Sequence, residues 1–125
     1  MKKVILVLLL LVLVGCQSVP EGDILIDSDG SLSEAECSIR GLEGKYVMIG
    51  SAFCSHCVDT KPVFEADCEE TGVDCVSIDT STTEGWELLE SYDLSVLYTP
   101  TFVFDCEYFI GAREDYVGLM QGEES

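Results

Sequence analysis

The hydrophobic pattern divides the chain into a leader, a polar stretch and a folded domain. Val4 to Val14 is an unbroken apolar run of 11 residues that follows Lys2 and Lys3. A spanning helix needs about 20 apolar residues, so this run is typical of an export signal. Residues 16–33 are mostly polar and are expected to be a tether, although Ile24-Leu25-Ile26 could form a short strand. The folded domain is expected over residues 34–125.

Four short β-prone runs predict the strands of this domain. Tyr46–Ile49 is a short apolar, β-prone run before Gly50 and is typical of a buried strand, and Val73–Ile78 is expected to be the next strand. Thr101–Asp105 and Tyr108–Ala112 are two further runs, separated only by Cys106-Glu107. A connection of two residues predicts a β-hairpin.

Ser55–Thr71 is predicted to be the longest helix, with Gly72 in the position of a C-terminal cap. Pro62 lies inside this helix and is expected to kink it. Three residues are spaced for burial on one face: Val58, Phe64 and Cys68.

The other helices are shorter. Ser81-Thr82-Thr83-Glu84 matches a capping box, which predicts the start of a helix. The large residues that recur after it are expected in the core, as is Phe104: Trp86, Leu89 and Tyr92. Glu114–Gln121 predicts a last short helix, and Ala35–Ile39 predicts a single helical turn before the breakers Gly41 and Gly44.

These elements give the order β-α-β-α-β-β-α. Alternating strands and helices predict an α/β domain with a mostly parallel sheet and helices on both faces. The closing hairpin adds antiparallel strands, so the sheet is expected to be mixed. About 90 residues bury only a modest core, and disulfides would stabilise it further.

The charge of the chain is strongly asymmetric. All 24 Asp and Glu residues lie after Cys16, and only four cations accompany them there: Arg40, Lys45, Lys61 and Arg113. Such a surface repels phosphate groups, which argues against nucleic acid as a partner and against electrostatic docking on anionic lipid. The acidic surface is consistent with solubility, with a saline habitat or with a basic partner.

Seven cysteines are an odd number for an exported protein. The apolar run ends in Leu13-Val14-Gly15-Cys16, which resembles the lipobox of bacterial-type lipoproteins. That resemblance implies that residues 1–15 are a lipoprotein signal peptide and that Cys16 becomes an acylated N-terminus holding the protein to the membrane. The alternatives are a signal cleaved elsewhere and an uncleaved anchor.

Six cysteines then remain for an oxidising compartment, where disulfides persist. Four of them are expected to lie at the end of the sheet opposite the Cys54 region and to form two structural disulfides: Cys37, Cys68, Cys75 and Cys106. Three pairings are possible. The short helix-to-strand loop slightly favours Cys68 with Cys75, which leaves Cys37 with Cys106. A second redox pair is the alternative.

The stretch Cys54-Ser55-His56-Cys57 carries the candidate chemistry. Cys54 follows a predicted strand and opens a predicted helix, where free backbone N–H groups and the helix dipole stabilise a thiolate. Cys54 is therefore expected to be the exposed nucleophile and Cys57, one turn later, the buried resolving cysteine. His56 would add positive charge when protonated. No metal site is expected, because these three side chains are too few for a closed zinc site.

The strand followed by Cys54 and Cys57, the proline at 62, and Thr99-Pro100 before an apolar strand together resemble the thioredoxin superfamily. The resemblance covers roughly residues 45–121. It implies a thioredoxin-like fold with a central mixed four-stranded sheet, a cis Pro100 facing the two cysteines, and Thr99 and Pro100 as substrate-binding residues. Two positions depart from the family pattern: Phe53 replaces a tryptophan, and Met48 replaces a buried acid.

The resulting hypothesis is a thiol–disulfide oxidoreductase outside the cytoplasm, anchored to the membrane by a lipidated Cys16. It would act on protein thiols and disulfides through Cys54, Cys57 and His56, as a monomer and without a cofactor. The direction of electron flow and the redox partner stay open. The alternative is a non-catalytic thioredoxin-fold lipoprotein that binds a partner or a metal and whose disulfides are purely structural.

Overall fold

The computed structural model describes residues 24–113 and 116–121. The elements in chain order are β1 (Ile24–Ile26), β2 (Gly30–Ser31), α2 (Glu34–Arg40), β3 (Lys45–Gly50), α3 (Ser55–Thr71), β4 (Asp74–Asp79), α4 (Thr83–Ser91), β5 (Leu94–Val96), β6 (Thr101–Phe104), β7 (Glu107–Ile110) and α5 (Val117–Met120). The expected export signal, Cys16 and part of the expected last helix lie outside the described residues.

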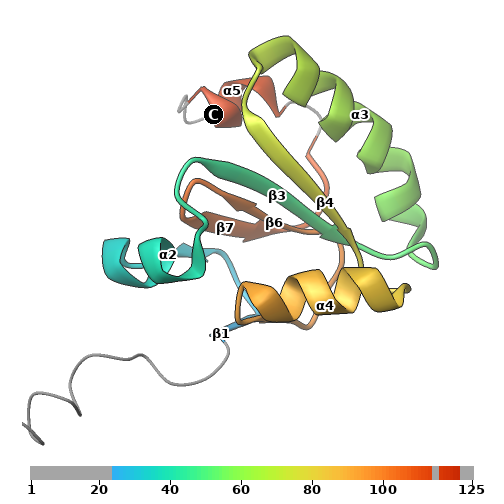
Figure 1. Ribbon diagram of the computed structural model, residues 1–125. Coiled ribbons are helices and arrows are strands. Elements are labelled where there is room, and N and C mark those ends of the chain that lie inside the picture. Colours follow the sequence, from blue (N-terminus) through green and yellow to red (C-terminus); the bar gives the residue numbers. More distant parts are fainter. Residues whose placement is uncertain (1–23, 114–115, 122–125) are drawn as a thin grey trace, which may run out of the picture.

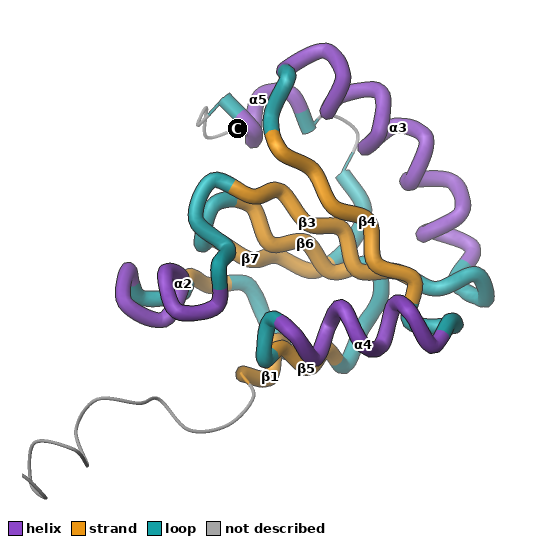
Figure 2. Tube along the Cα trace, in the orientation of Figure 1, coloured by secondary structure: helices purple, strands orange, loops and turns teal. Residues whose placement is uncertain are grey.

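A mixed five-stranded sheet forms the centre of the α/β domain, with the strand order β2-β7-β6-β3-β4 (Figures 1 and 2). β3 pairs in parallel with β4 and antiparallel with β6. The expected sheet had four strands, and the fifth is β2, which pairs with β7 through Gly30 and Ser31. A separate parallel pair of β1 and β5 was also not expected as a sheet.

Helices cover both faces of the sheet, with α3 and α5 on one face and α2 and α4 on the other (Figure 1). Along β3, Val47 and Ile49 pack into a largely aliphatic cluster on the α4 face, whereas Tyr46 and Met48 belong to an aromatic-rich cluster on the α3 face. Because successive side chains of a strand point to opposite faces, a strand buried on both sides reads as the continuous apolar run seen in the sequence.

The expected tether is shorter than residues 16–33, since the chain joins the folded domain from Ile24. Ile26 is fully buried and Leu32 is nearly so. The backbone N–H of Leu32 donates to the carbonyl of Cys106 at 2.7 Å. α2 begins at the N-cap Ser33 and ends at Gly41 in the left-handed region, so it is longer than the single turn expected.

α3 has the predicted bounds, runs through Pro62, and ends at Gly72, which has a φ of 72°. Glycine adopts this left-handed conformation without steric cost. The expected burial of Val58 is wrong, because its side chain is 57% exposed. The expected burial of Phe64 and Cys68 is confirmed, and Cys57 and Thr60 complete the buried face of the helix.

α4 begins one residue later than the capping box predicts. Thr82 is the N-cap, and its hydroxyl accepts from the N–H of Gly85, so Glu84 does not occupy the third helical position. The expected burial of Trp86 is also wrong, since 51% of it is exposed. The expected burial of Leu89, Tyr92 and Phe104 is confirmed.

The β6–β7 hairpin turns at Asp105-Cys106 rather than at Cys106-Glu107. Both turn residues have positive φ, and Glu107 is already paired with Phe104. A two-residue hairpin turn favours positive φ and often carries Asp. The carboxylate of Asp105 accepts from the N–H of Gly44 at 2.8 Å, which holds the turn against the start of β3.

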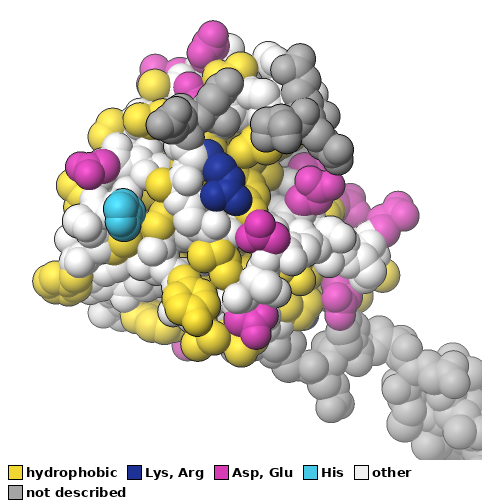
Figure 3. All heavy atoms as spheres, turned by 180° about the vertical axis from the view of Figure 1, so that it is seen from behind, with side chains coloured by type: hydrophobic (Ala, Val, Ile, Leu, Met, Phe, Trp, Pro, Cys, Tyr) yellow, Lys and Arg dark blue, Asp and Glu magenta, His cyan; other side chains and the backbone are white. Residues whose placement is uncertain are grey.

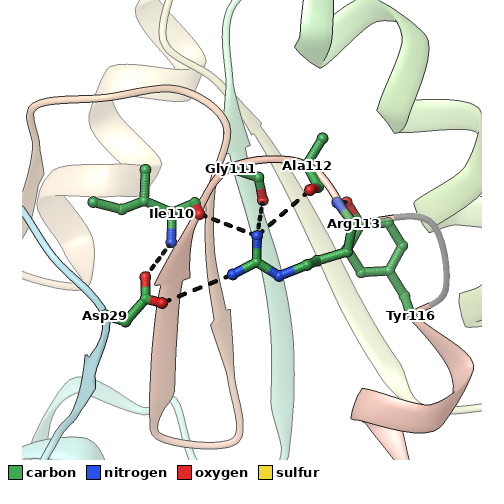
Figure 4. Close-up of polar contacts among 6 residues, drawn as sticks. All are labelled: Asp29, Ile110, Gly111, Ala112, Arg113 and Tyr116. Carbon is green, nitrogen blue, oxygen red and sulfur yellow. Dashed lines mark hydrogen bonds and ion pairs between the residues drawn. The ribbon is translucent and has the colours of Figure 1, made fainter. Parts of the chain in front are cut away.

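Arg113 fastens the segment after β7 (Figure 4). Its guanidinium donates to the carbonyls of Ile110 and Gly111 and lies 3.8 Å from a carboxylate oxygen of Asp29. The N–H of Arg113 donates to the phenol oxygen of Tyr116 at 2.8 Å. Burial raises the pKa of Tyr116, which is fully enclosed in the aromatic cluster.

Candidate functional site

Cys54 occupies the N-cap of α3, directly after the loop that leaves β3. Its sulfur accepts from the backbone N–H of Cys57 at 3.2 Å, the hydrogen bond that a Ser or Asp side chain makes at an ordinary N-cap. The unpaired N–H groups at this end of the helix place positive potential on the sulfur. The position therefore favours negative charge on Cys54 when the protein is reduced.

Cys54 and Cys57 form a disulfide, with their Cα atoms 5.2 Å apart. Cys57 is only 4% exposed, whereas Cys54 is partly exposed. A Cβ added to Gly50 would lie 3.2 Å from the sulfur of Cys57, so a glycine at the end of β3 lets the helix start come this close. The two sulfurs thus differ in access, as a nucleophile and a resolving cysteine must.

The loop before β6 lies beside Cys54. The carbonyl oxygen of Thr99 is 3.5 Å from the sulfur of Cys54, and the Thr99–Pro100 peptide bond is cis. In the disulfide Cys54 has no S–H, so this is a contact rather than a hydrogen bond. The hydroxyl of Thr101 donates to the carbonyl of Tyr98 at 2.6 Å and holds the loop in place. The two halves of the expected site are therefore adjacent.

His56 stands on the surface in the first turn of α3. It is the only histidine of the chain, and Figure 3 shows it exposed with hydrophobic side chains nearby. Three large exposed residues come from the two loops that flank the disulfide, namely Phe53 at 90%, Leu97 at 59% and Tyr98 at 55% exposure. This apolar rim was not predicted from the sequence. Its signal was the occurrence of aromatic and aliphatic residues in loop segments on either side of the site residues.

A pocket of about 400 Å³ opens on the inner side of Cys57, between α3 and β4. Met48, which stands where the resemblance places an acid, forms part of its wall and is 2% exposed. Asp79 lies at its rim. A hydrogen bond from the Ser81 hydroxyl is the main cause that lowers the pKa of Asp79, and smaller contributions come from backbone N–H groups, including that of Ala52.

The other cysteines form the disulfides Cys37–Cys106 and Cys68–Cys75, the pairing that the spacing favours. Both lie at the opposite end of the sheet from Cys54. Cys57 and Cys68 are 11 residues apart on α3, which corresponds to about 16 Å along the helix. Direct exchange between the two disulfides needs sulfur contact, so the expected alternative of an intramolecular relay is not supported in this conformation.

No group of three or more His, Cys, Asp and Glu side chains in residues 24–113 and 116–121 is arranged to hold a metal ion. No helix within these residues has the length and apolarity needed to span a membrane. Comparison of the chain with protein-family models, with curated proteins and with solved structures gave no match.

Proposed function

We propose that the protein is a thiol–disulfide oxidoreductase of the thioredoxin-like superfamily. The observation that carries the proposal is the placement of a disulfide at the N-terminus of α3, with Cys54 capped by the N–H of Cys57 and partly exposed. A structural crosslink of only three residues' separation would stabilise the fold little. A site that favours a thiolate on the accessible sulfur suits reversible exchange.

The proposed reaction is a two-step exchange. In reduction of a client disulfide, the Cys54 thiolate attacks one client sulfur, the client S–S bond breaks, and the second client sulfur leaves as a thiolate and takes up a proton. Deprotonated Cys57 then attacks Cys54 and releases the first client sulfur. The protein ends as the Cys54–Cys57 disulfide, and the client has gained two electrons and two protons. Oxidation of a client dithiol is the reverse sequence.

Protein segments are the proposed substrates. The backbone at Thr99 and Pro100 lies against Cys54, where an extended client segment would pair with it by β-strand addition. The exposed rim of Phe53, Leu97 and Tyr98 supports this choice, since it offers apolar contact beyond the reacting sulfur. A small thiol such as glutathione would leave most of this rim uncovered.

We further propose that the protein acts outside the cytoplasm and is anchored by a lipidated Cys16, as a monomer. The lipobox-like sequence supports the anchor. Three disulfides that use all six cysteines of the described domain support an oxidising compartment. No nucleic acid partner is proposed, because carboxylates outnumber cations so strongly.

The reduction potential of the Cys54–Cys57 pair is the measurement that tests the function and sets its direction. Equilibration with glutathione and dithiothreitol buffers, followed by thiol alkylation and mass analysis, gives the value directly. A potential near about −120 mV identifies a disulfide donor, and one near about −270 mV a reductant. Resistance to reduction below about −300 mV would overturn the redox role and leave a structural disulfide.

A trapping experiment identifies the clients. Cys57→Ala removes the resolving thiol, so the mixed disulfide through Cys54 should accumulate. Cells expressing this variant should show dithiothreitol-sensitive complexes on non-reducing gels, which a Cys54→Ala/Cys57→Ala variant lacks. Equal complexes in both variants, or none in either, would contradict the proposed role of Cys54.

A further inference from the structure

β4 is an edge strand with nothing paired to its outer side among the described residues. It ends the strand order of the five-stranded sheet and pairs only with β3 (Figure 2). The opposite edge strand, β2, has two residues, whereas β4 has six. Long uncovered edges are uncommon, because their free backbone groups bind other strands.

The free backbone groups of β4 can be assigned. The N–H of Thr80 donates to the carbonyl of Gly50 at the end of β3. The backbone N–H and C=O groups of successive residues point to opposite sides of a strand. Those of Val76 and Ile78 therefore also point toward β3, whereas those of Cys75, Ser77 and Asp79 point outward. The carbonyl of Asp79 is occupied by Thr82. The groups of Cys75 and Ser77, and the N–H of Asp79, remain for an added strand.

The pocket beside Cys57 lies next to this edge. It is lined by apolar side chains of β3 and α3, including Met48, Val58 and Pro62, and by Ser77 of β4. A strand added outside β4 would direct every second side chain toward the α3 face, where this pocket is. The edge therefore combines free main-chain groups with space for side chains, the two features that β-addition requires.

The charges around the edge select the occupant. Asp74 and Asp79 stand at its two ends, and Glu65 of α3 lines the adjacent pocket. Lys61, the cation of the pocket, lies 3.9 Å from Glu65. Antiparallel pairing of two copies about Ser77 would bring the Asp74 end of each strand to the Asp79 end of the other, within a chain that is strongly acidic. The carboxylates gathered at both ends of such a pair would repel one another, so a second copy is disfavoured.

We propose that the outer edge of β4 binds an extended segment of a partner protein, with basic residues at both ends and alternating small apolar residues between them. The segment adds a sixth strand to the sheet, and its apolar side chains enter the pocket between α3 and β4. The proposal does not depend on redox activity at Cys54.

A blocked peptide, acetyl-Lys-Thr-Val-Thr-Val-Lys-amide, is the probe for this site. Titrated into the ¹⁵N-labelled protein, it should cause saturable shifts of the amides of Cys75, Ser77 and Asp79 below about 1 mM. A peptide with both lysines replaced by glutamate should bind at least about tenfold more weakly. A peptide N-methylated at alternate residues should lose binding, since it lacks the main-chain donors.

A matched pair of variants tests the strand edge from the side of the protein. Ser77→Pro removes an outward N–H that takes no part in pairing with β3, a position where an edge strand tolerates proline. It should weaken peptide binding at least about fivefold. Ser77→Ala keeps the N–H and should bind as the unaltered protein does. Circular dichroism and the unfolding transition confirm that both variants fold.

Several results would overturn the proposal. One is the absence of saturable shifts at about 1 mM peptide. Shifts confined to residues around Cys54 and Pro100 would assign the peptide to the redox site instead. Equal binding of the N-methylated peptide would rule out strand addition. A concentration-dependent dimer in sedimentation that Ser77→Pro abolishes would make a second copy the occupant.

Discussion

The two ends of the central sheet carry the same kind of covalent bond in different surroundings. At one end, the Cys54–Cys57 disulfide closes a loop with a sequence separation of three, and Cys54 is open to the surface. At the other end, Cys37–Cys106 spans a separation of 69, and Cys37 is fully buried. The contribution of a disulfide to stability grows with the loop it closes, while its reactivity depends on access and on thiolate stabilisation. The two bonds therefore differ in the length of the loop that they close and in the access to their sulfurs, which is the difference expected between a redox-active and a structural disulfide under the proposed function.

Removing the nucleophile gives the largest expected effect. Cys54→Ser should lower the rate of disulfide exchange with a fluorescent disulfide-linked peptide about a thousandfold or more, because no thiolate remains at the helix terminus. The free energy of unfolding should fall by no more than about 2 kcal/mol, as the bond closes a very short loop. Activity retained at more than about a tenth of the original would contradict the assignment of Cys54.

The fold and the site differ in how far the sequence predicts them. The main strands, α3 and Gly72 follow from periodicity and from glycine's freedom at positive φ. The short strands β2 and β5 did not, because two or three residues carry no periodic signal. Trp86 shows another limit, since helical spacing predicts a shared face but not whether a neighbouring element covers it.

The site shows the same division. The placement of Cys54 at a helix start was predictable from the order of a strand, a CxxC pair and a helical segment. The apolar rim of Leu97 and Tyr98 was not, because only the tertiary fold brings that loop to the disulfide. The pocket beside β4 likewise depends on which strand lies at the edge of the sheet. The local hydrophobic pattern does not determine strand order.

Loss of the Cys37–Cys106 disulfide, at the other end of the sheet, should lower stability but leave exchange activity nearly unchanged. Cys37→Ala together with Cys106→Ala should lower the free energy of unfolding by about 4 kcal/mol, from the loop-entropy relation for the long loop. Urea unfolding at fixed pH measures the change. Exchange activity per folded molecule should stay within about twofold of the original. A larger loss of activity would mean that the two ends of the sheet are coupled.

The Cys68–Cys75 disulfide should make an intermediate contribution to stability. Cys68–Cys75 has a sequence separation of seven and joins the end of α3 to β4. Cys68→Ala with Cys75→Ala should therefore cost about 2.5 kcal/mol by the same relation, less than the long-loop pair and more than Cys54→Ser. The order of the three effects, measured under identical conditions, tests whether loop length governs stability here. Any reversal would show that local packing outweighs chain entropy.

Tyr116 stabilises the segment after β7 without a covalent bond. Tyr116→Phe removes the oxygen that accepts from the N–H of Arg113 and should cost about 1 kcal/mol near neutral pH. Burial raises the pKa of Tyr116 in the folded protein, so its contribution is complete below the ordinary phenol pKa and is lost as the pH rises through the raised value. The difference between the two proteins should be constant below about pH 10, the ordinary phenol value, and should shrink as the pH rises above it. A difference that stays constant above that value would contradict this linkage.

The smallest expected effect comes from the charge of His56, which should act only at the Cys54 end of the sheet. His56 is exposed in the first turn of α3, close in sequence to the thiolate and remote from both other disulfides. A protonated imidazole there stabilises the Cys54 thiolate by about 0.3–1 kcal/mol, so His56→Ala should slow alkylation of the reduced protein about two- to fivefold at mildly acidic pH. His56→Arg keeps a cation and should restore the rate, and added salt should reduce the difference because exposed charges are screened. The free energy of unfolding of the oxidised variants should be unchanged, since neither Cys37–Cys106 nor Cys68–Cys75 lies near His56. If His56→Ala and His56→Arg react equally fast at low salt, the helix terminus and its N–H groups alone activate Cys54.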